Sequence, residues 1–142
     1  MANKIAIIGL GIMGRRMLEN ALIHPDFEVS GIWDPADASI AKARKLGVDL
    51  PIAVDASAAM ANADVVYLAC PPAPRKDYAL AAARAGKGVF MEKPLGTDNT
   101  ESENLVAQLE SAPLPAVVNF TQASSRGFDA LQCAIDLSLI HI

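Results

Sequence analysis

The segment that most constrains the fold is residues 4–14, with the sequence Lys-Ile-Ala-Ile-Ile-Gly-Leu-Gly-Ile-Met-Gly. A β-branched run at residues 5–8 is typical of a buried strand, and the Gly-x-Gly-x-x-Gly pattern after it opens a helix. Gly9 permits a tight turn out of the strand, Gly11 leaves room for a pyrophosphate against the backbone, and Gly14 lets the helix pack closely. The segment therefore predicts a strand–turn–helix unit that binds a dinucleotide.

The start of the predicted helix adds an electrostatic contribution. Backbone N–H groups at Ile12 and Met13 carry partial positive charge toward the phosphates. Alone, the glycine pattern also occurs in ordinary turns, and its spacing fits a Walker A phosphate loop. Arg15 and Arg16 stand where that loop needs Lys followed by Ser or Thr, which excludes it.

An acidic residue follows at the position that a ribose requires. A second predicted strand, residues 27–33, ends in Asp34, about twenty residues past Gly14, which is the spacing of a carboxylate that accepts hydrogen bonds from an adenosine ribose. The alternative is a turn acid, because Asp-Pro commonly begins a turn. No arginine follows in Pro35-Ala36-Asp37 to meet a 2′-phosphate, so the sequence favours NAD over NADP.

The rest of the chain alternates helical and strand patterns with short connections. Helices are expected at residues 11–23, 38–46 (ending at Gly47), 57–62, 75–85, 100–111 and from 128, and strands at 51–54, 65–69, 89–91 and 116–121. Alternation of this kind is typical of an α/β fold. We expect a doubly wound parallel sheet, a Rossmann fold of about six strands with helices on both faces.

Composition limits the possible partners. The chain has 142 residues and a net charge of −4, which argues against a nucleic-acid surface. No apolar run is long enough to span a bilayer. Cys70 and Cys133 form no metal-binding pattern, so no metal site is expected. These features predict a soluble, cytoplasmic protein.

A second motif, Glu92-Lys93-Pro94, follows the predicted strand at residues 89–91. The loop Cys70-Pro71-Pro72 follows another strand, and the carboxyl ends of parallel strands border the crevice where ligands bind. A charged pair at the end of an apolar strand could simply be solvated. The alternative is that Lys93 lies beside a cofactor and a substrate, steadied by Glu92 and the proline.

Several residues together resemble the Gfo/Idh/MocA oxidoreductases over about residues 3–136. The residues that carry the resemblance are Cys70-Pro71, Ala79, Ala82, Ala85-Gly86-Lys87, Val89 and Glu92-Lys93-Pro94. The resemblance implies an NAD(P)-dependent dehydrogenase that acts on sugars, inositols or similar polyols. It also implies that Lys93 contacts the substrate hydroxyl near the hydride-transfer centre, and that Cys70, Pro71 and Pro72 border the cofactor.

The chain departs from this family at a few positions, and two other interpretations stay open. The family often has Thr or Ser at Cys70, Asn at Pro72 and His at Arg75. Residues 8–17 also resemble the β-hydroxyacid dehydrogenases, but the Asp-Ala-Pro-Val-Ser-Gly-Gly-like run of those enzymes is missing near residues 92–96. The other possibility is an NAD-binding module that performs no chemistry.

The end of the chain leads to expectations about domain organisation. We expect a nucleotide-binding domain at residues 1–123 and, at 124–136, the start of a helix leading to a missing substrate domain. Residues 137–142 are similar to a translated sequencing-adapter end, the alternative being a genuine apolar helix end. Such a fragment would bind NAD without turnover, and the parent protein would form homo-oligomers through the missing domain. Apolar surface should lie exposed near the last strand and helix.

Overall fold

A computed structural model of the chain describes residues 2–46, 49–121 and 125–137. Strands and helices alternate along it as the sequence predicts. The elements are β1 (Asn3–Ile8), α1 (Ile12–Ile23), β2 (Phe27–Trp33), α2 (Asp37–Arg44), α3 (Ala56–Met60), β3 (Val65–Leu68), α4 (Pro72–Arg84), β4 (Gly88–Glu92), α5 (Asn99–Glu110), β5 (Ala116–Asn119) and α6 (Arg126–Asp136). No helix within these described ranges is long and apolar enough to cross a membrane.

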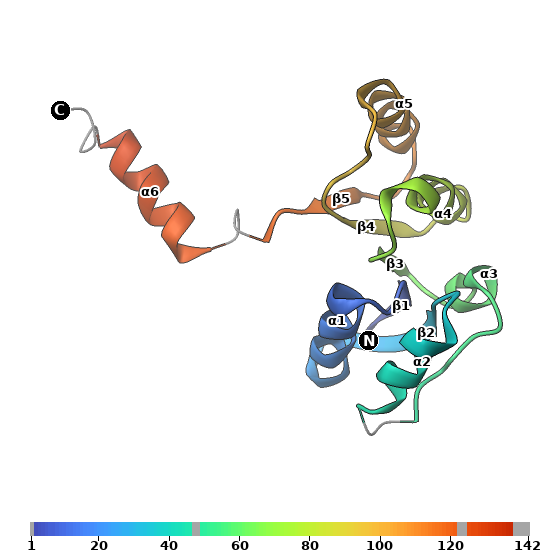
Figure 1. The fold of residues 1–142 in the computed structure, drawn as a ribbon. Helices are drawn as coiled ribbons and strands as arrows, with labels where there is room; N and C mark the ends of the chain where they lie inside the picture. Colours follow the sequence, from blue (N-terminus) through green and yellow to red (C-terminus); the bar gives the residue numbers. More distant parts are fainter. Residues whose placement is uncertain (1, 47–48, 122–124, 138–142) are drawn as a thin grey trace.

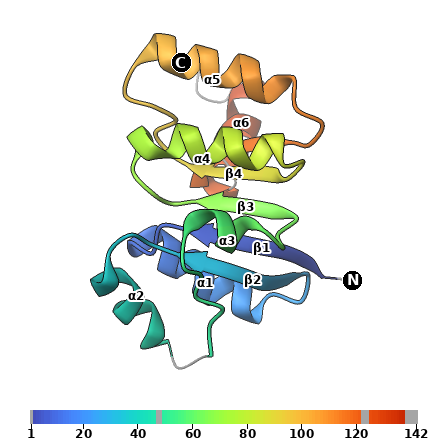
Figure 2. The ribbon, with the colours of Figure 1, turned by 90° about the vertical axis from the view of Figure 1, so that its right-hand side faces the viewer.

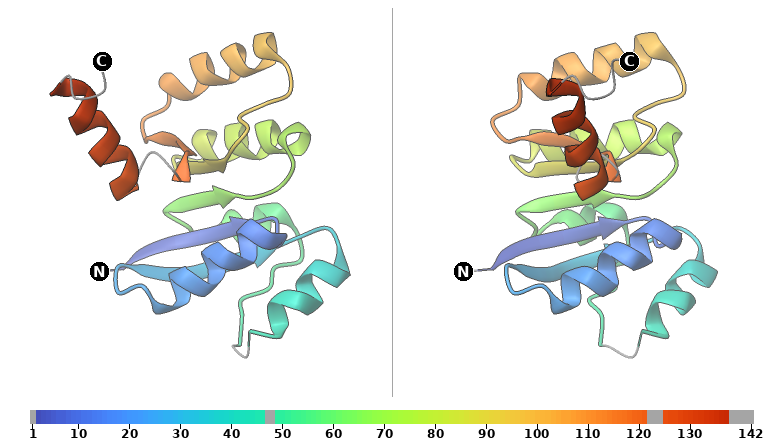
Figure 3. Two further views of the ribbon diagram at one scale, coloured as in Figure 1. Left: turned by 60° about the vertical axis from the view of Figure 1, so that its left-hand side comes forward. Right: turned by 90° about the vertical axis from the view of Figure 1, so that its left-hand side faces the viewer.

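The strands form one parallel sheet in the order β2-β1-β3-β4-β5. Helices α3, α4 and α5 lie on one face of the sheet (Figure 2), and α1 lies on the other (Figure 3). The predicted doubly wound α/β fold is therefore confirmed. The chain runs from β1 outward to β2 and then crosses back to β3 on the other side of β1. This change of direction places a crevice at the carboxyl ends of β1 and β3.

The predicted strand count of six is wrong, because residues 51–54 form no strand. Ile52 makes an isolated parallel bridge to Ile32. Only two backbone hydrogen bonds support it, from the Ile32 N–H to the Pro51 carbonyl and from the Ala53 N–H to the Ile32 carbonyl. Pro51 has no N–H to donate, and Val54 is 90% exposed, so the segment touches the sheet edge without extending it.

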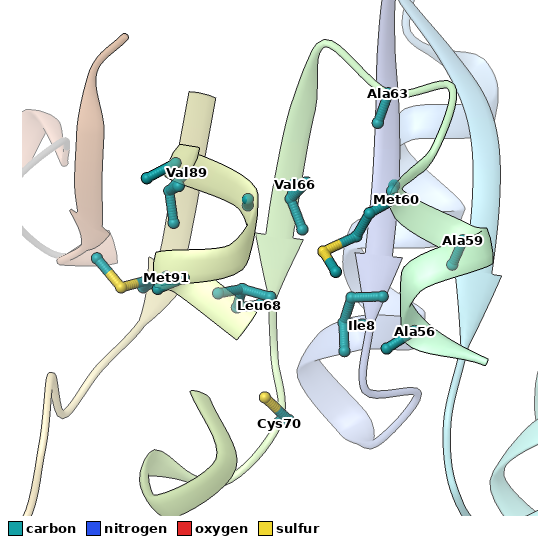
Figure 4. Close-up of a cluster of buried hydrophobic side chains, with 14 of the residues drawn as sticks. Ile8, Ala56, Ala59, Met60, Ala63, Val66, Leu68, Cys70, Val89 and Met91 are labelled. Atoms are coloured by element: carbon teal, nitrogen blue, oxygen red, sulfur yellow. The ribbon is translucent and has the colours of Figure 1, made fainter. Parts of the chain in front are cut away.

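Both faces of the central strands are buried, as a parallel sheet requires. Successive residues of β1 point to opposite faces, so Ala6 and Ile8 belong to one buried cluster while Ile5 and Ile7 belong to the other. Figure 4 shows the first cluster, in which Ile8 lies beside side chains of α3 and β3, and side chains of β4 continue the cluster on the other side of β3. These two cores hold the strand ends, and the loops that follow them, in fixed positions.

Two helix starts were predicted with different success. Helix α5 begins at Asn99, one residue before the predicted start, and Asp98 caps it by accepting a hydrogen bond from the Glu101 N–H. Helix α4 begins at Pro72, three residues earlier than expected, because proline is well tolerated in the first turn of a helix, where its missing N–H leaves no hydrogen bond unmade. The predicted helix stop at Gly47 lies outside the described residues.

The last strand and helix leave apolar surface exposed, as predicted. Val117 on β5 is 52% exposed, and Phe120 after it is 62% exposed. Helix α6 stands away from the sheet, on the side where α1 lies (Figure 1), and its Phe128 and Leu131 are also exposed. The division into residues 1–123 and 124–136 stays a prediction, and all of the adapter-like segment 137–142 except Leu137 lies outside the described part.

Candidate functional site

One cavity of about 910 Å³ lies at the carboxyl ends of β1 to β4. All but two of the predicted site residues line it: Gly9, Gly11, Met13, Asp34, Cys70, Pro71, Pro72, Glu92 and Lys93. The two exceptions flank the glycine turn. Ile12 is 68% exposed, and Gly14 is buried beneath the turn. Four loops that are distant in sequence therefore meet at the place where open α/β sheets bind ligands.

The glycine turn has the geometry that its sequence predicts. Gly9 has φ +94°, and a Cβ there would lie 2.6 Å from the Cys70 amide nitrogen. A Cβ on Gly14 would lie 1.8 Å from the Gly9 carbonyl oxygen, so the helix can approach the turn only without a side chain. A Cβ on Gly11 would meet no protein atom within 4 Å. Since Gly11 lines the cavity, that space is open to a ligand.

The start of α1 is suited to bind an anion. Its N-cap residue, Gly11, makes no side-chain capping bond, and its first turn contains no acidic residue. The first N–H groups of the helix are therefore free of a side-chain cap, and the helix dipole favours negative charge there. Arg16, which the sequence did not single out as a site residue, also lines the cavity. Its position one turn into the helix could have indicated this.

Asp34 joins the glycine turn to the end of β2. One carboxylate oxygen accepts a hydrogen bond from the Leu10 N–H at 2.7 Å, and the other accepts one from the Ala36 N–H at 2.8 Å. A turn acid would accept the same hydrogen bond from the Ala36 N–H, so Asp34 also has the structural role that the sequence offered as the alternative. Asp34 lines the cavity, and each of its oxygens can accept a further hydrogen bond.

The loop after β3 forms one wall of the cavity. Cys70 is only 6% exposed, and burial raises the pKa of its thiol above the ordinary value. Pro71 precedes α4 and Pro72 is its first residue. A second wall is aromatic, because Trp33 and Tyr78 meet edge to face with ring centroids 6.2 Å apart, and both line the cavity.

Glu92, at the end of β4, is buried within a polar group of three side chains. Its Oε1 accepts hydrogen bonds from the Tyr67 hydroxyl and from the Asn119 amide, the latter at 2.6 Å. Burial, followed by the hydrogen bond to Glu92, raises the pKa of Tyr67 well above its ordinary value, so the hydroxyl remains a donor. The sequence missed Tyr67 and Asn119, because neighbouring strands bring them to Glu92.

Lys93 is exposed at the edge of the same cavity. In the described part of the chain, the ion pair identified is Lys76–Glu101, and no ion pair links Lys93 to Glu92. The expectation that Glu92 steadies Lys93 therefore has no direct ion pair behind it. A further buried cation, Arg75, hydrogen-bonds to the backbone on both sides of Lys93. No local sequence pattern indicated this contact, because α4 supplies it from outside the motif.

The chain is similar to known proteins in sequence and in fold. An oxidoreductase family with an NAD-binding Rossmann fold, Gfo/Idh/MocA, matches residues 3–120. An inositol 2-dehydrogenase of Pseudomonas syringae pv. syringae is 32% identical over 146 residues, a match that covers 96% of this chain and 42% of that protein.

Two solved structures share the fold. Myo-inositol 2-dehydrogenase from Lactobacillus plantarum superimposes with a TM-score of 0.83 at 22% identity, over 96% of this chain and 41% of that one. The WlbA dehydrogenase from Chromobacterium violaceum, solved with NADH and UDP-GlcNAcA, gives a TM-score of 0.83 at 19% identity. The match covers 95% of this chain and 40% of that one.

These findings agree with the geometry of the cavity. The chain spans 40–42% of the length of the relatives described above. The family match covers both the glycine turn and the Glu92-Lys93-Pro94 motif, and it favours the first of the two resemblances over the β-hydroxyacid dehydrogenases. The chain belongs to the Gfo/Idh/MocA oxidoreductase family and forms its NAD-binding Rossmann domain.

Proposed function

We propose that this domain is the cofactor half of a dehydrogenase that transfers hydride between NAD and a secondary hydroxyl of an inositol or related polyol. The observation that carries the proposal is that Lys93 and the glycine turn border one cavity. The inositol 2-dehydrogenase relative supports the substrate class. The bound cofactor would supply the hydride chemistry, and the protein would supply binding, orientation and charge.

Each part of the cavity has its own role in this proposal. Open backbone at Gly11 and the first N–H groups of α1 would bind the pyrophosphate. The free lone pairs of Asp34 would accept hydrogen bonds from the adenosine ribose. Lys93 would hold and polarise the reacting hydroxyl, and Cys70, Pro71 and Pro72 would border the nicotinamide half.

A longer polypeptide would complete the enzyme. Because the relatives extend well beyond the matched segment, we propose that a second domain supplies the acid–base residues and closes over the substrate. The exposed apolar surface at Val117 and Phe120 fits such a covering domain. In this proposal the 142-residue chain binds NAD without turnover, and the complete protein is cytoplasmic and forms homo-oligomers through the second domain.

Replacing Lys93 with Met in a complete enzyme that carries this domain tests the catalytic role. We expect kcat for myo-inositol oxidation to fall by about 100-fold or more, while the Kd for NAD changes little, because Lys93 would act on the substrate. The matched control is Lys76→Met, since Lys76 pairs with Glu101 on the protein surface. Equal losses in kcat and NAD affinity would show that Lys93 is structural.

A further inference from the structure

We propose that Arg75 is a positioning residue that fixes the backbone of Lys93 relative to the cofactor cavity. The inference rests on the proposed role of Lys93 beside the cofactor. Arg75 lies in the first turn of α4 and is only 3% exposed, although it carries a charge. A guanidinium is costly to bury unless its N–H groups are hydrogen-bonded, so the partners of this one indicate what it does.

The partners of Arg75 are all backbone carbonyl groups. Its Nη1 donates to the carbonyl oxygens of Glu92 and Pro94, which are the residues on either side of Lys93. Its Nε donates to the Cys70 carbonyl at 3.1 Å, and Nη2 donates to the same oxygen. One rigid, planar group therefore joins the loop after β3 to the loop after β4.

The arrangement fixes Lys93 without touching its side chain. Because Nη1 binds the carbonyls before and after Lys93, the chain is held on both sides of that residue. The Lys93 side chain remains exposed and free to reach into the cavity. Among the described residues no carboxylate lies within ion-pair distance of the guanidinium. Its charge is therefore used to strengthen hydrogen bonds to the two loops.

The position of Lys93 can be followed by NMR on the 142-residue chain. Reductive methylation with 13C labels every lysine, and the Lys93 signal is assigned from the Lys93→Arg variant. NADH is then added until energy transfer from Trp33, the only tryptophan in the chain and part of the cavity wall, shows saturation. In the wild type we expect the Lys93 signal to shift on binding. In Arg75→Met we expect that shift to fall by roughly half or more.

Two further variants separate positioning from general stability. Arg84→Met removes an exposed arginine from the same helix and should retain the full shift. Arg75→Lys keeps the charge but loses the planar fork, so it should not restore the shift, and it serves as the test if Arg75→Met fails to fold. The Lys87 signal is an internal reference, because its Nζ donates to the Ala61 and Ala63 carbonyls away from the cavity.

The outcomes test the positioning role of Arg75 separately from the proposed place of Lys93 beside the cofactor. A full Lys93 shift in folded Arg75→Met, or in Arg75→Lys where that variant carries the test, would overturn the positioning role and leave the proposed function intact. A wild-type Lys93 signal that stays still while Trp33 reports bound NADH would instead refute the proposed place of Lys93, and the positioning role with it. Loss of the Lys93 shift with an unchanged Lys87 signal would support both.

Discussion

The glycine turn at residues 9–14 and the loop at residues 92–94 face the same cavity, but different features determine their conformations. The turn depends on missing side chains, because a Cβ on Gly14 would collide with the Gly9 carbonyl. The loop depends on buried polar side chains from other elements, above all Arg75. A binding surface for phosphate needs open backbone, whereas a reactive lysine needs a fixed backbone and a free side chain.

The largest expected effect comes from closing the turn. Gly14→Ala would place a Cβ 1.8 Å from the Gly9 carbonyl oxygen, so we expect the free energy of unfolding to fall by about 3 kcal/mol or more and NADH binding to be lost. Chemical denaturation and an NADH titration measure the two losses.

The matched control for this change is Gly11→Ala, because a Cβ there meets no protein atom and the backbone has φ −63°. This variant should keep its stability and lose about tenfold in NADH affinity by filling the cavity. Equal destabilisation of the two variants would contradict the distinction between a packing glycine and a ligand-facing glycine.

Asp34→Ala tests whether the acid does more than shape a turn. We expect NADH affinity to fall by about tenfold or more, because the charge-assisted hydrogen bonds to the ribose are lost together with the one to the Leu10 N–H. The wild type should bind NADH more tightly than NADPH, and Asp34→Ala should narrow that gap. Asp37→Ala, at the exposed start of α2, is the control. If Asp34→Ala bound NADH as tightly as the wild type, Asp34 would only shape the turn and would not bind the ribose.

Removing one hydroxyl tests the polar group beneath the lysine loop. Tyr67→Phe deletes a hydrogen bond to the buried Glu92, which should lower the free energy of unfolding by about 1–2 kcal/mol. Tyr78→Phe changes a half-buried tyrosine at the cavity wall and should cost much less. Urea denaturation compares the two, and equal costs would show that the Tyr67–Glu92 contact contributes little.

The smallest effect is a change with pH. Because the folded chain raises the pKa of Tyr67 above its ordinary value of 10.0, its stabilising contribution is complete below about pH 10 and is lost as the pH rises further. The stability gap between the wild type and Tyr67→Phe should therefore be constant up to about pH 10 and narrow as the pH rises to about 11. If urea denaturation shows the same stability difference between the two proteins at about pH 10 and at about pH 11, the raised pKa of Tyr67 is contradicted.

The two regions also differ in how far the sequence could predict them. The roles of Gly9, Gly11 and Gly14 follow from local spacing, and the turn has the geometry expected of it. The strand ends that carry Cys70 and Lys93 follow from apolar patterns, so the meeting of the loops at one cavity was also predictable. The missing sixth strand was not, because pairing at the sheet edge depends on contacts with β2 that no local pattern encodes.

The contacts of Arg75, Tyr67 and Asn119 could not be predicted for a related reason. Their hydrogen bonds to Glu92 join residues between 17 and 27 positions apart, on elements that only the tertiary fold brings together. The sequence suggested that Glu92 steadies Lys93 directly, whereas the carboxyl group binds Tyr67 and Asn119. That Glu92 steadies Lys93 in catalysis stays a prediction, and no ion pair joins the two among the described residues.

The most direct test of the account is to map backbone amide shifts of the 15N-labelled chain during an NADH titration. If the four loops form one cofactor site, the largest amide shift changes will fall in the loops that line the cavity. These are residues 9–13, Asp34 and Ala36, the loop around Cys70, and Lys93. The α3–α5 face away from these loops will change little. Saturable changes centred elsewhere, or none at saturating NADH, would contradict the assignment of this cavity as the NAD site.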